Sequence, residues 1–170
     1  MKAKTPTRPA MTGARGNGFK LEDFLPYRLS VAASRVSRLM ARQYSAAYGL
    51  SIPEWRVLSM VGRFGTLSPS MVGERTAMDK VKVSRATASL VSRGMLSQTQ
   101  DPNDGRGRLL RLTRKGTSVY QGLVPLAREL EHKLAEAMSR TEWAALLKAL
   151  DKLGVQAVAV EDTTYAEAAD

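Results

Sequence analysis

Positively charged side chains concentrate in the middle of this 170-residue chain. Residues 73–116 hold ten basic and four acidic side chains, so this segment carries six of the ten net positive charges. Lysine and arginine donate hydrogen bonds to phosphate oxygens and to the edges of guanine. A basic helix beside a basic hairpin is the charge pattern of proteins that bind duplex nucleic acid. The segment therefore predicts a DNA-binding surface.

The side chains that most often carry catalysis are scarce. The chain has no cysteine and a single histidine, His132. The lack of cysteine excludes disulfides, cysteinyl zinc sites and thiol-based switches, and one histidine makes a poor transition-metal site. No G-x-S-x-G, G-x-x-x-x-G-K-[ST] or H-E-x-x-H motif occurs in the sequence. We therefore expect a protein that is not an enzyme and that uses neither a metal nor a cofactor.

Charge and hydropathy restrict the partners further. A net charge of +10 and a pI near 10.2 favour polyanions, with nucleic acid ahead of an anionic membrane surface. No apolar run approaches the roughly 20 residues that span a bilayer. The basic N-terminus is not followed by the apolar stretch of a secretory signal. We expect a cytoplasmic protein without a membrane partner.

Two short helices are predicted within residues 68–94. Ser68 and Pro69 mark a helix start, with serine as the N-cap and proline at the first helical position. Asp79 caps the second helix and Gly94 ends it. Apolar side chains recur along its inner side and leave basic and hydroxyl side chains on its outer face. With the hairpin arginines included, the residues predicted to contact DNA are Ser68, Lys80, Lys82, Val83, Ser84, Arg85, Thr87, Arg106 and Arg108.

A β-hairpin is predicted next. Residues 96–100 and 108–113 are strand-like, with apolar side chains pointing inward by alternation, and residues 101–106 form the tip. Asp104, in this tip, has two equally plausible roles. Its carboxylate either holds an arginine of the hairpin or of the preceding helix in place, or it stabilises the tight turn.

Helical patterns flank this central region. Apolar residues recur every three or four positions over residues 26–48 and again after residue 115. Ser51 with Glu54 forms a capping box, and residues 139–142 form another. The predicted fold class is mainly α with a small β-hairpin, a winged helix-turn-helix with N- and C-terminal dimerisation helices. Because the winged helix is complete without the terminal helices, their apolar seams predict a homodimer.

The sequence divides accordingly. Residues 1–20 contain five basic residues, no acidic residue and no apolar periodicity, so we expect a disordered basic arm. Residues 21–48 and 115–160 are the predicted dimerisation helices, and residues 49–114 are the predicted DNA-binding domain. Residues 161–170 are expected to form an acidic tail.

In their order and spacing these motifs resemble the MarR family of transcriptional regulators, over about residues 29–153. Family proteins typically read D-K-x-x-V-S-R, K-G-L-V, D-P-x-D-R-R and L-T-x-x-G. The corresponding segments here are D-K at 79–80, V-S-R at 83–85, R-G-M-L at 93–96, D-P-N-D at 101–104, Arg106, and L-T-R-K-G at 112–116. Gly105 replaces the first of two arginines common at the hairpin tip. A DNA contact by the hairpin therefore depends on Arg106 and Arg108.

The resemblance implies a mode of DNA binding. The helix that begins after Asp79 would enter the major groove, and the hairpin (the wing) would bring Arg106 to the adjacent minor groove, whose negative potential attracts arginine. Two such heads in a dimer would bind a palindromic operator, about one helical turn or roughly 34 Å apart. Repression would follow because the bound dimer blocks polymerase.

The resemblance also implies an effector, because many family members release DNA when a small aromatic anion binds between the dimerisation helices and the winged helix. Residues 27–31 and 52–58 are similar to the subgroup that controls the degradation of aromatic acids, including sensors of hydroxycinnamoyl-CoA. We expect an aromatic acid or its CoA thioester as the effector. The arginines of the first helix would pair with its carboxylate or phosphates, or they form a solvated face. The candidate ligand-binding residues are Tyr27, Arg28, Val31, Ser34, Arg35 and Trp55.

A second function remains open at this point. A non-specific architectural DNA-binding protein of the nucleoid type would carry the same positive charge, because phosphate contacts contain no sequence information. A specific regulator keeps an affinity for its site several orders of magnitude above its non-specific affinity at physiological salt, which separates the two.

Overall fold

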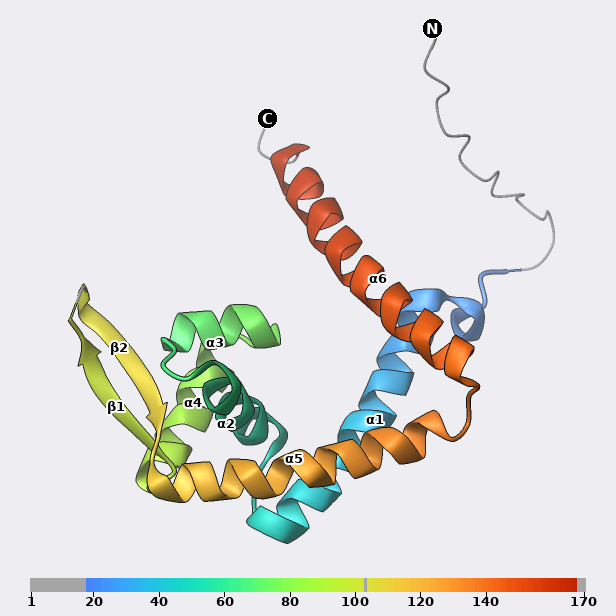
Figure 1. Ribbon diagram of the computed structural model, residues 1–170. Helices are drawn as coiled ribbons and strands as arrows, with labels where there is room; N and C mark the ends of the chain where they lie inside the picture. The colour runs from blue at the N-terminus through green and yellow to red at the C-terminus, as the bar shows by residue number, and fades with distance from the viewer. Residues whose placement is uncertain (1–17, 103, 168–170) are drawn as a thin grey trace, which may run out of the picture. The chain divides into compact units, whose positions relative to one another are not determined.

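The computed structural model describes residues 18–102 and 104–167 (Figure 1). The chain divides into two compact units, Met1–Ser37 and Arg38–Asp170. The 3-10 helix η1 (Leu21–Asp23) and the first half of α1 (Leu25–Tyr48) belong to the first unit. The second half of α1 and all later elements belong to the second unit. Residues 1–17 of the predicted basic arm lie outside the described residues.

The junction between α1 and α2 is closed by a glycine and a capping box. Gly49 has a φ of 63°, a left-handed conformation that costs glycine little, and its amide donates to Ser45 O at 2.8 Å. α2 (Ile52–Phe64) follows Ser51, whose hydroxyl accepts from the Glu54 amide at 3.4 Å. The Glu54 carboxylate accepts in turn from the Ser51 amide at 2.7 Å. The capping box predicted from the sequence is confirmed.

Helices α3 (Pro69–Thr76) and α4 (Lys80–Ser92) are the predicted pair of short helices. The Ser68 hydroxyl caps α3 by accepting from the Met71 amide at 3.2 Å. The Asp79 carboxylate caps α4 by accepting from the Lys82 amide at 2.8 Å. Between the helices Ala77 has a φ of 50°, and it is the only described residue other than glycine with a positive φ. A single left-handed residue thus turns the chain from one helix to the next.

Strands β1 (Leu96–Asp101) and β2 (Asp104–Leu112) pair antiparallel in a two-stranded sheet (Figure 1). β2 begins at Asp104, four residues before the predicted start of the strand at residue 108. The difference arises because backbone pairing continues into the tip, where side-chain alternation no longer marks the strand. At its other end Leu110 exchanges two backbone hydrogen bonds with Leu67, at 2.8 and 3.2 Å, which fixes the hairpin to the segment before α3.

The core of the second unit joins the end of α1, helices α2 to α5 and the hairpin. α2 packs against α3, α4, β2 and α5, and α4 packs also against β1. Eleven of its apolar side chains are at most 2% exposed: Tyr44, Leu50, Val57, Leu58, Val61, Leu67, Val72, Val83, Leu90, Leu96 and Leu110. This packing holds α4 in one orientation relative to α2 and the hairpin.

Helix α5 (Arg114–Ala135) starts directly against the base of the hairpin. Thr113 caps it by accepting from the Gly116 amide at 3.1 Å. A Cβ atom at Gly116 would lie 2.0 Å from Met95 O, so only glycine allows this approach. The helix continues through Pro125 and ends at Ala135.

Helix α6 (Arg140–Glu167) is longer than the sequence predicted. It begins with the predicted capping box, in which Glu142 accepts from the Ser139 amide at 2.8 Å. It runs through residues 161–167, which are the first part of the predicted acidic tail. No α6 side chain of described burial is buried.

Candidate nucleic-acid interface

The outer face of α4 presents basic and hydroxyl side chains. Lys80, Lys82, Ser84 and Arg85 are all exposed, and α4 contains no acidic residue. Lys82 Nζ lies 2.9 Å from an Asp79 carboxylate oxygen, in an exposed ion pair that contributes little stability. The hydrogen bonds from Lys82 hold the pKa of the Asp79 carboxyl below its usual range, so the cap remains charged at neutral pH. The helix therefore offers cations on one accessible side.

Two of the residues on α4 that the sequence predicted as DNA contacts are buried. Val83 is 2% exposed and Thr87 is 4% exposed, and both side chains pack inside the second unit. On a helix with 3.6 residues per turn, they lie on the same side as Leu90, which belongs to the core. A side chain on that side cannot reach a base edge while the helix stays packed.

Sequence reasoning missed Val81 and Ala88. Both are exposed, and Val81 keeps 58% of its surface accessible. Seven residues apart, they lie on the same outer side as Ser84 and Arg85. The signal was present in the sequence, since this row is opposite the buried stripe. A valine there is suited to contact the methyl group of thymine.

A hollow of about 590 Å³ lies between α3, α4 and β1. The Thr87 hydroxyl has no hydrogen-bond partner among the described residues and borders this hollow. Ser70 donates to Glu74 at 3.2 Å beside it, so one carboxylate stands among the donors. The polar and charged residues that line the hollow are Ser70, Glu74, Lys80, Ser84, Thr87 and Gln98.

The wing and the start of α3 supply the remaining candidates. Arg108 is exposed on β2, opposite Gln100. The backbones of Asp104 and Arg106 belong to β2, but their side chains lie outside the described part of the structure. Ser68 is half-buried, and its hydroxyl is engaged in capping α3. The roles of these four residues in DNA binding stay predictions.

The predicted effector-binding residues fall into two groups. Tyr27, Arg28, Val31, Ser34 and Arg35 lie on the first half of α1, in the first unit, and all but the half-buried Val31 are exposed. Trp55 lies on α2, in the second unit. The two groups therefore belong to separate units and are described separately.

Trp55 borders a cavity of about 240 Å³ between the end of α1, α2 and α5. Its ring centroid lies 5.0 Å from that of Tyr44. The Tyr44 hydroxyl is buried and has no hydrogen-bond partner among the described residues, and burial raises its pKa. Arg63 and Arg128 supply two positive charges to the lining, and Glu131 supplies one negative charge. The cavity is therefore lined by aromatic rings, by positively charged side chains and by the Tyr44 residue, whose hydroxyl could bond to a ligand.

Two further properties concern the described residues alone. Among them no group of three or more histidine, cysteine, aspartate or glutamate side chains is arranged to hold a metal ion. In the same part of the chain no helix combines the length and the apolar character needed to cross a bilayer.

The central segment is similar to one known protein family. Residues 48–107 match the profile of the MarR family. The repressor IacR of Pseudomonas putida is 23% identical over 133 residues, which are 78% of this chain and 79% of that repressor. The resemblance inferred from the motifs is thereby confirmed.

Solved structures agree on the fold. A MarR/EmrR family transcriptional regulator from Acinetobacter sp. ADP1 superposes with a TM-score of 0.75 at 22% identity, covering 82% of this chain and 98% of that one. BpsR of Bordetella bronchiseptica, whose DNA binding is regulated by 6-hydroxynicotinic acid, superposes with a TM-score of 0.74 at 22% identity, covering 81% and 98%. The predicted fold class, a mainly helical winged helix-turn-helix, is confirmed.

Proposed function

Because residues 48–107 of this chain form a MarR-family domain, we propose that it is a ligand-responsive transcriptional regulator. It acts as a repressor, binds palindromic duplex DNA as a homodimer, and is released by a small aromatic acid or its CoA thioester. The observation that carries the proposal is the outer face of α4, where Ser84, Arg85 and two lysines are exposed while the opposite side is locked into the core. A rigid helix with donors on one side suits the major groove.

Specific readout is supported by the mixture of side chains on α4. Arg85 can donate two hydrogen bonds to guanine, and the exposed Val81 can contact a thymine methyl group. Lys80 and Lys82 flank this row, where they suit phosphates. A surface that combined only lysines would favour the architectural alternative. The wing, with Arg108 exposed, would add a contact to the neighbouring groove.

Dimerisation is supported by the apolar face of α6. Leu146, Leu150 and Leu153 are spaced four and three residues apart, as in the seam of a helix pair. Each keeps between 37% and 40% of its surface exposed. A row of exposed leucines on a long helix is unfavourable in water and favours burial against a second copy of the chain.

The proposed effector site is the cavity beside Trp55. At about 240 Å³ it is smaller than the roughly 300–1,000 Å³ of most ligand pockets, which favours a one-ring compound. Arg63 and Arg128 can pair with its carboxylate, and the Tyr44 hydroxyl can donate to it. The exposed arginines on the first half of α1, in the first unit, stay separate candidates for binding an anionic effector.

The proposed regulation of specific genes is tested by selecting sheared genomic DNA from the source organism with the purified chain near physiological salt. The expected result is a small number of sharp peaks that share a palindrome. Recovery that depends only on fragment length would instead indicate the architectural, nucleoid-type protein. Affinities for a recovered site and for its scrambled sequence should then differ by about 10³-fold or more.

The effector proposal is tested on the recovered site with benzoate as the probe. In a Trp143→Phe background, Trp55 is the only tryptophan, so quenching of its fluorescence reports occupancy of the cavity. Benzoate should quench Trp55 and weaken DNA binding over the same concentration range. Arg128→Gln should raise the concentration required for both effects, whereas the matched control Arg140→Gln, outside the cavity lining, should not.

A further inference from the structure

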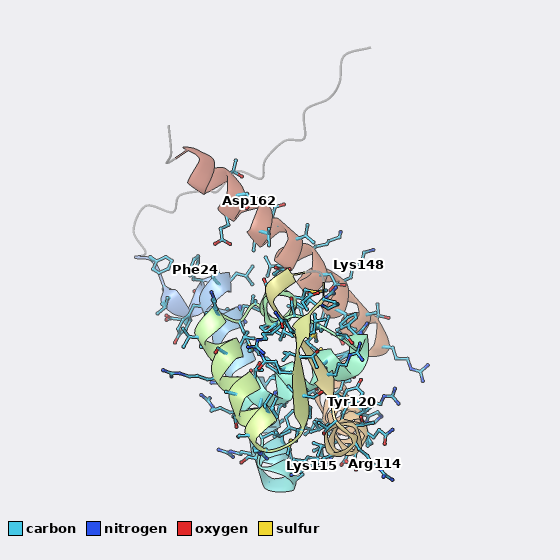
Figure 2. All side chains as sticks on the ribbon, turned by 90° about the vertical axis from the view of Figure 1, so that its left-hand side faces the viewer. Phe24, Arg114, Lys115, Tyr120, Lys148 and Asp162 are labelled. Carbon is cyan, nitrogen blue, oxygen red and sulfur yellow. The ribbon has the colours of Figure 1, made fainter. Side chains whose placement is uncertain are left out.

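Arg93 connects the end of α4 to the junction between α1 and α2. Its guanidinium donates to Tyr48 O at 2.8 Å and to Gly49 O at 3.1 Å, and it lies 3.4 Å from a carboxylate oxygen of Glu54. Tyr48 ends α1, so Arg93 satisfies a carbonyl that the helix leaves without an internal partner. Lys115, labelled at the start of α5 in Figure 2, donates to Arg93 O at 2.9 Å. One residue thus contacts three segments.

Glu54 is the buried counterpart of Arg93. It is 8% exposed and accepts hydrogen bonds from Ser51 and from the Ser89 hydroxyl of α4. Burial alone would raise the pKa of its carboxyl. The hydrogen bonds from Ser89 and Ser51, with the charge of Arg93, outweigh burial and hold that pKa below its usual range. This buried carboxylate has hydrogen-bond partners on both the α2 and the α4 side, so it fixes the two helices relative to each other. If they separated, the carboxylate would lose a partner and remain as an uncompensated buried charge, which is strongly destabilising.

Helix α2 therefore serves two sites with neighbouring residues. Glu54 bonds to α4, whereas Trp55 and Ser59 border the cavity beside Tyr44. The rest of the inner face of α2 is also packed against the core, with Val57 and Leu58 fully buried. A packed helix moves as a unit, so a displacement of its cavity side is carried to its Glu54 side.

We infer that Glu54 and Arg93 are positioning residues that transmit occupancy of the Trp55 cavity to the orientation of α4. The inference rests on the proposed function in that α4 is taken as the DNA-reading helix. An occupant that pushes Trp55 and Ser59 outward shifts α2, and the bonds from Glu54 to Ser89 and Arg93 pull α4 with it. Without these bonds, apolar contacts still hold α4 in the fold. Its orientation, however, no longer changes when the cavity is occupied.

A cavity-filling substitution tests this without any ligand. Ser59→Phe places an aromatic ring in the cavity, and Arg93→Gln removes the charge and most donors of the connecting side chain. The wild type, both single variants and the double variant are compared. The two readouts are amide hydrogen exchange of α4 (Lys80–Ser92) and affinity for a selected DNA site. Arg140→Gln, at the start of α6, is the matched arginine control.

The expected result is a strong dependence of one substitution on the other. Ser59→Phe should speed exchange in α4 and weaken DNA binding about 10-fold, within the usual range of coupling between sites. In the Arg93→Gln background the same substitution should change both readouts less than twofold, and Arg93→Lys should restore part of the effect. In the Arg140→Gln background the full effect of Ser59→Phe should remain. Independent, multiplicative effects of Ser59→Phe and Arg93→Gln would overturn the inference, as would an unchanged α4 in Ser59→Phe.

The two readouts separate this inference from the proposed function. Coupled changes of exchange in α4 without any site-specific DNA binding would support the transmission and reject the regulator. Specific DNA binding, with the effect of Ser59→Phe on hydrogen exchange in α4 independent of Arg93→Gln, would support the regulator and reject the transmission. If Ser59→Phe does not fold, Ser59→Leu fills less of the cavity and is judged by the same criteria, with circular dichroism as the check of folding.

Discussion

In the winged-helix region Leu58 and Leu90 are fully buried within one chain, whereas on α6 Leu147 and Leu150 keep 44% and 40% of their surface exposed. Both regions are helical and rich in leucine, so composition does not separate them. The difference is that the winged helix encloses its own core and α6 does not. The first region should therefore have a stability of its own, and the second should gain stability only from a partner.

Leu90→Ala tests the self-contained core and should have the largest effect. It removes a fully buried side chain of α4, and such a change costs about 2–5 kcal/mol through lost burial and the cavity left behind. Urea unfolding followed by circular dichroism should show the loss at every protein concentration. Val155→Ala, at a 74% exposed position of α6, is the control. Equal losses in the two variants would remove the contrast between the regions.

Arg85→Ala tests whether α4, held rigidly in the winged-helix region, distinguishes one DNA sequence from another. We expect a loss of about 1–3 kcal/mol of discrimination between a selected site and its scrambled sequence, because a bidentate contact to guanine is lost. Lys82→Ala, one turn nearer the helix start, should weaken both DNAs equally and lower the salt dependence by about one charge. Fluorescence anisotropy at several salt concentrations distinguishes the two. Equal weakening by Arg85→Ala would make it a phosphate contact.

Leu150→Ser tests the dependence of α6 on a partner. Replacing an apolar seam residue should raise the dimer dissociation constant about 10-fold or more, because central apolar contacts dominate most interfaces. Sedimentation across a dilution series measures this directly, and Lys148→Ser on the same helix is the control. Because the variant dimer dissociates at higher protein concentrations than the wild type, its melting temperature should begin to fall at a higher protein concentration during dilution. A wild type that stays monomeric at all concentrations would refute the proposed dimer.

Acidification should affect the winged-helix region through Glu54, with a smaller effect. The pKa of this carboxyl is lower in the folded chain than its ordinary value of 4.5. Its stabilising contribution is therefore complete above about pH 4.5 and is lost as the pH falls through the lower folded value. The difference in unfolding free energy between wild type and Glu54→Gln should shrink over that range. A difference independent of pH would mean that the carboxylate charge contributes nothing to the junction.

Local signals predicted the elements well. Ser51 with Glu54, Ser68 with Pro69, and Asp79 each marked a helix start, because capping depends on side chains within three positions of one another. Caps, breakers and apolar periodicity together predicted the order of the elements, and the MarR-like motifs added the expected mode of DNA binding. What the sequence could not provide was the rotation of α4 about its axis. Val83 was predicted to contact DNA, and only the packing of α4 shows that it lies on the buried side of the helix.

The effector site shows a different limit. Trp55 was predicted as a lining residue, but Tyr44, Arg63 and Arg128 were not, since they come from three helices separated by many residues. Their proximity depends on how α5 crosses α2. Glycines allow that crossing to be close, as a Cβ at Gly62 would lie 2.6 Å from the ring of Tyr120. No periodicity within one helix encodes such a contact.

Ala77 makes the turn between α3 and α4 a place for engineering. Its φ of 50° is a conformation that costs an L-residue with a Cβ roughly 1–2 kcal/mol and costs glycine far less. Glycine would also gain freedom in the unfolded chain, which offsets about 0.4–1 kcal/mol. A net gain remains for Ala77→Gly. A single substitution in this turn should therefore raise the thermal stability of the protein without changing any side chain on the outer face of α4.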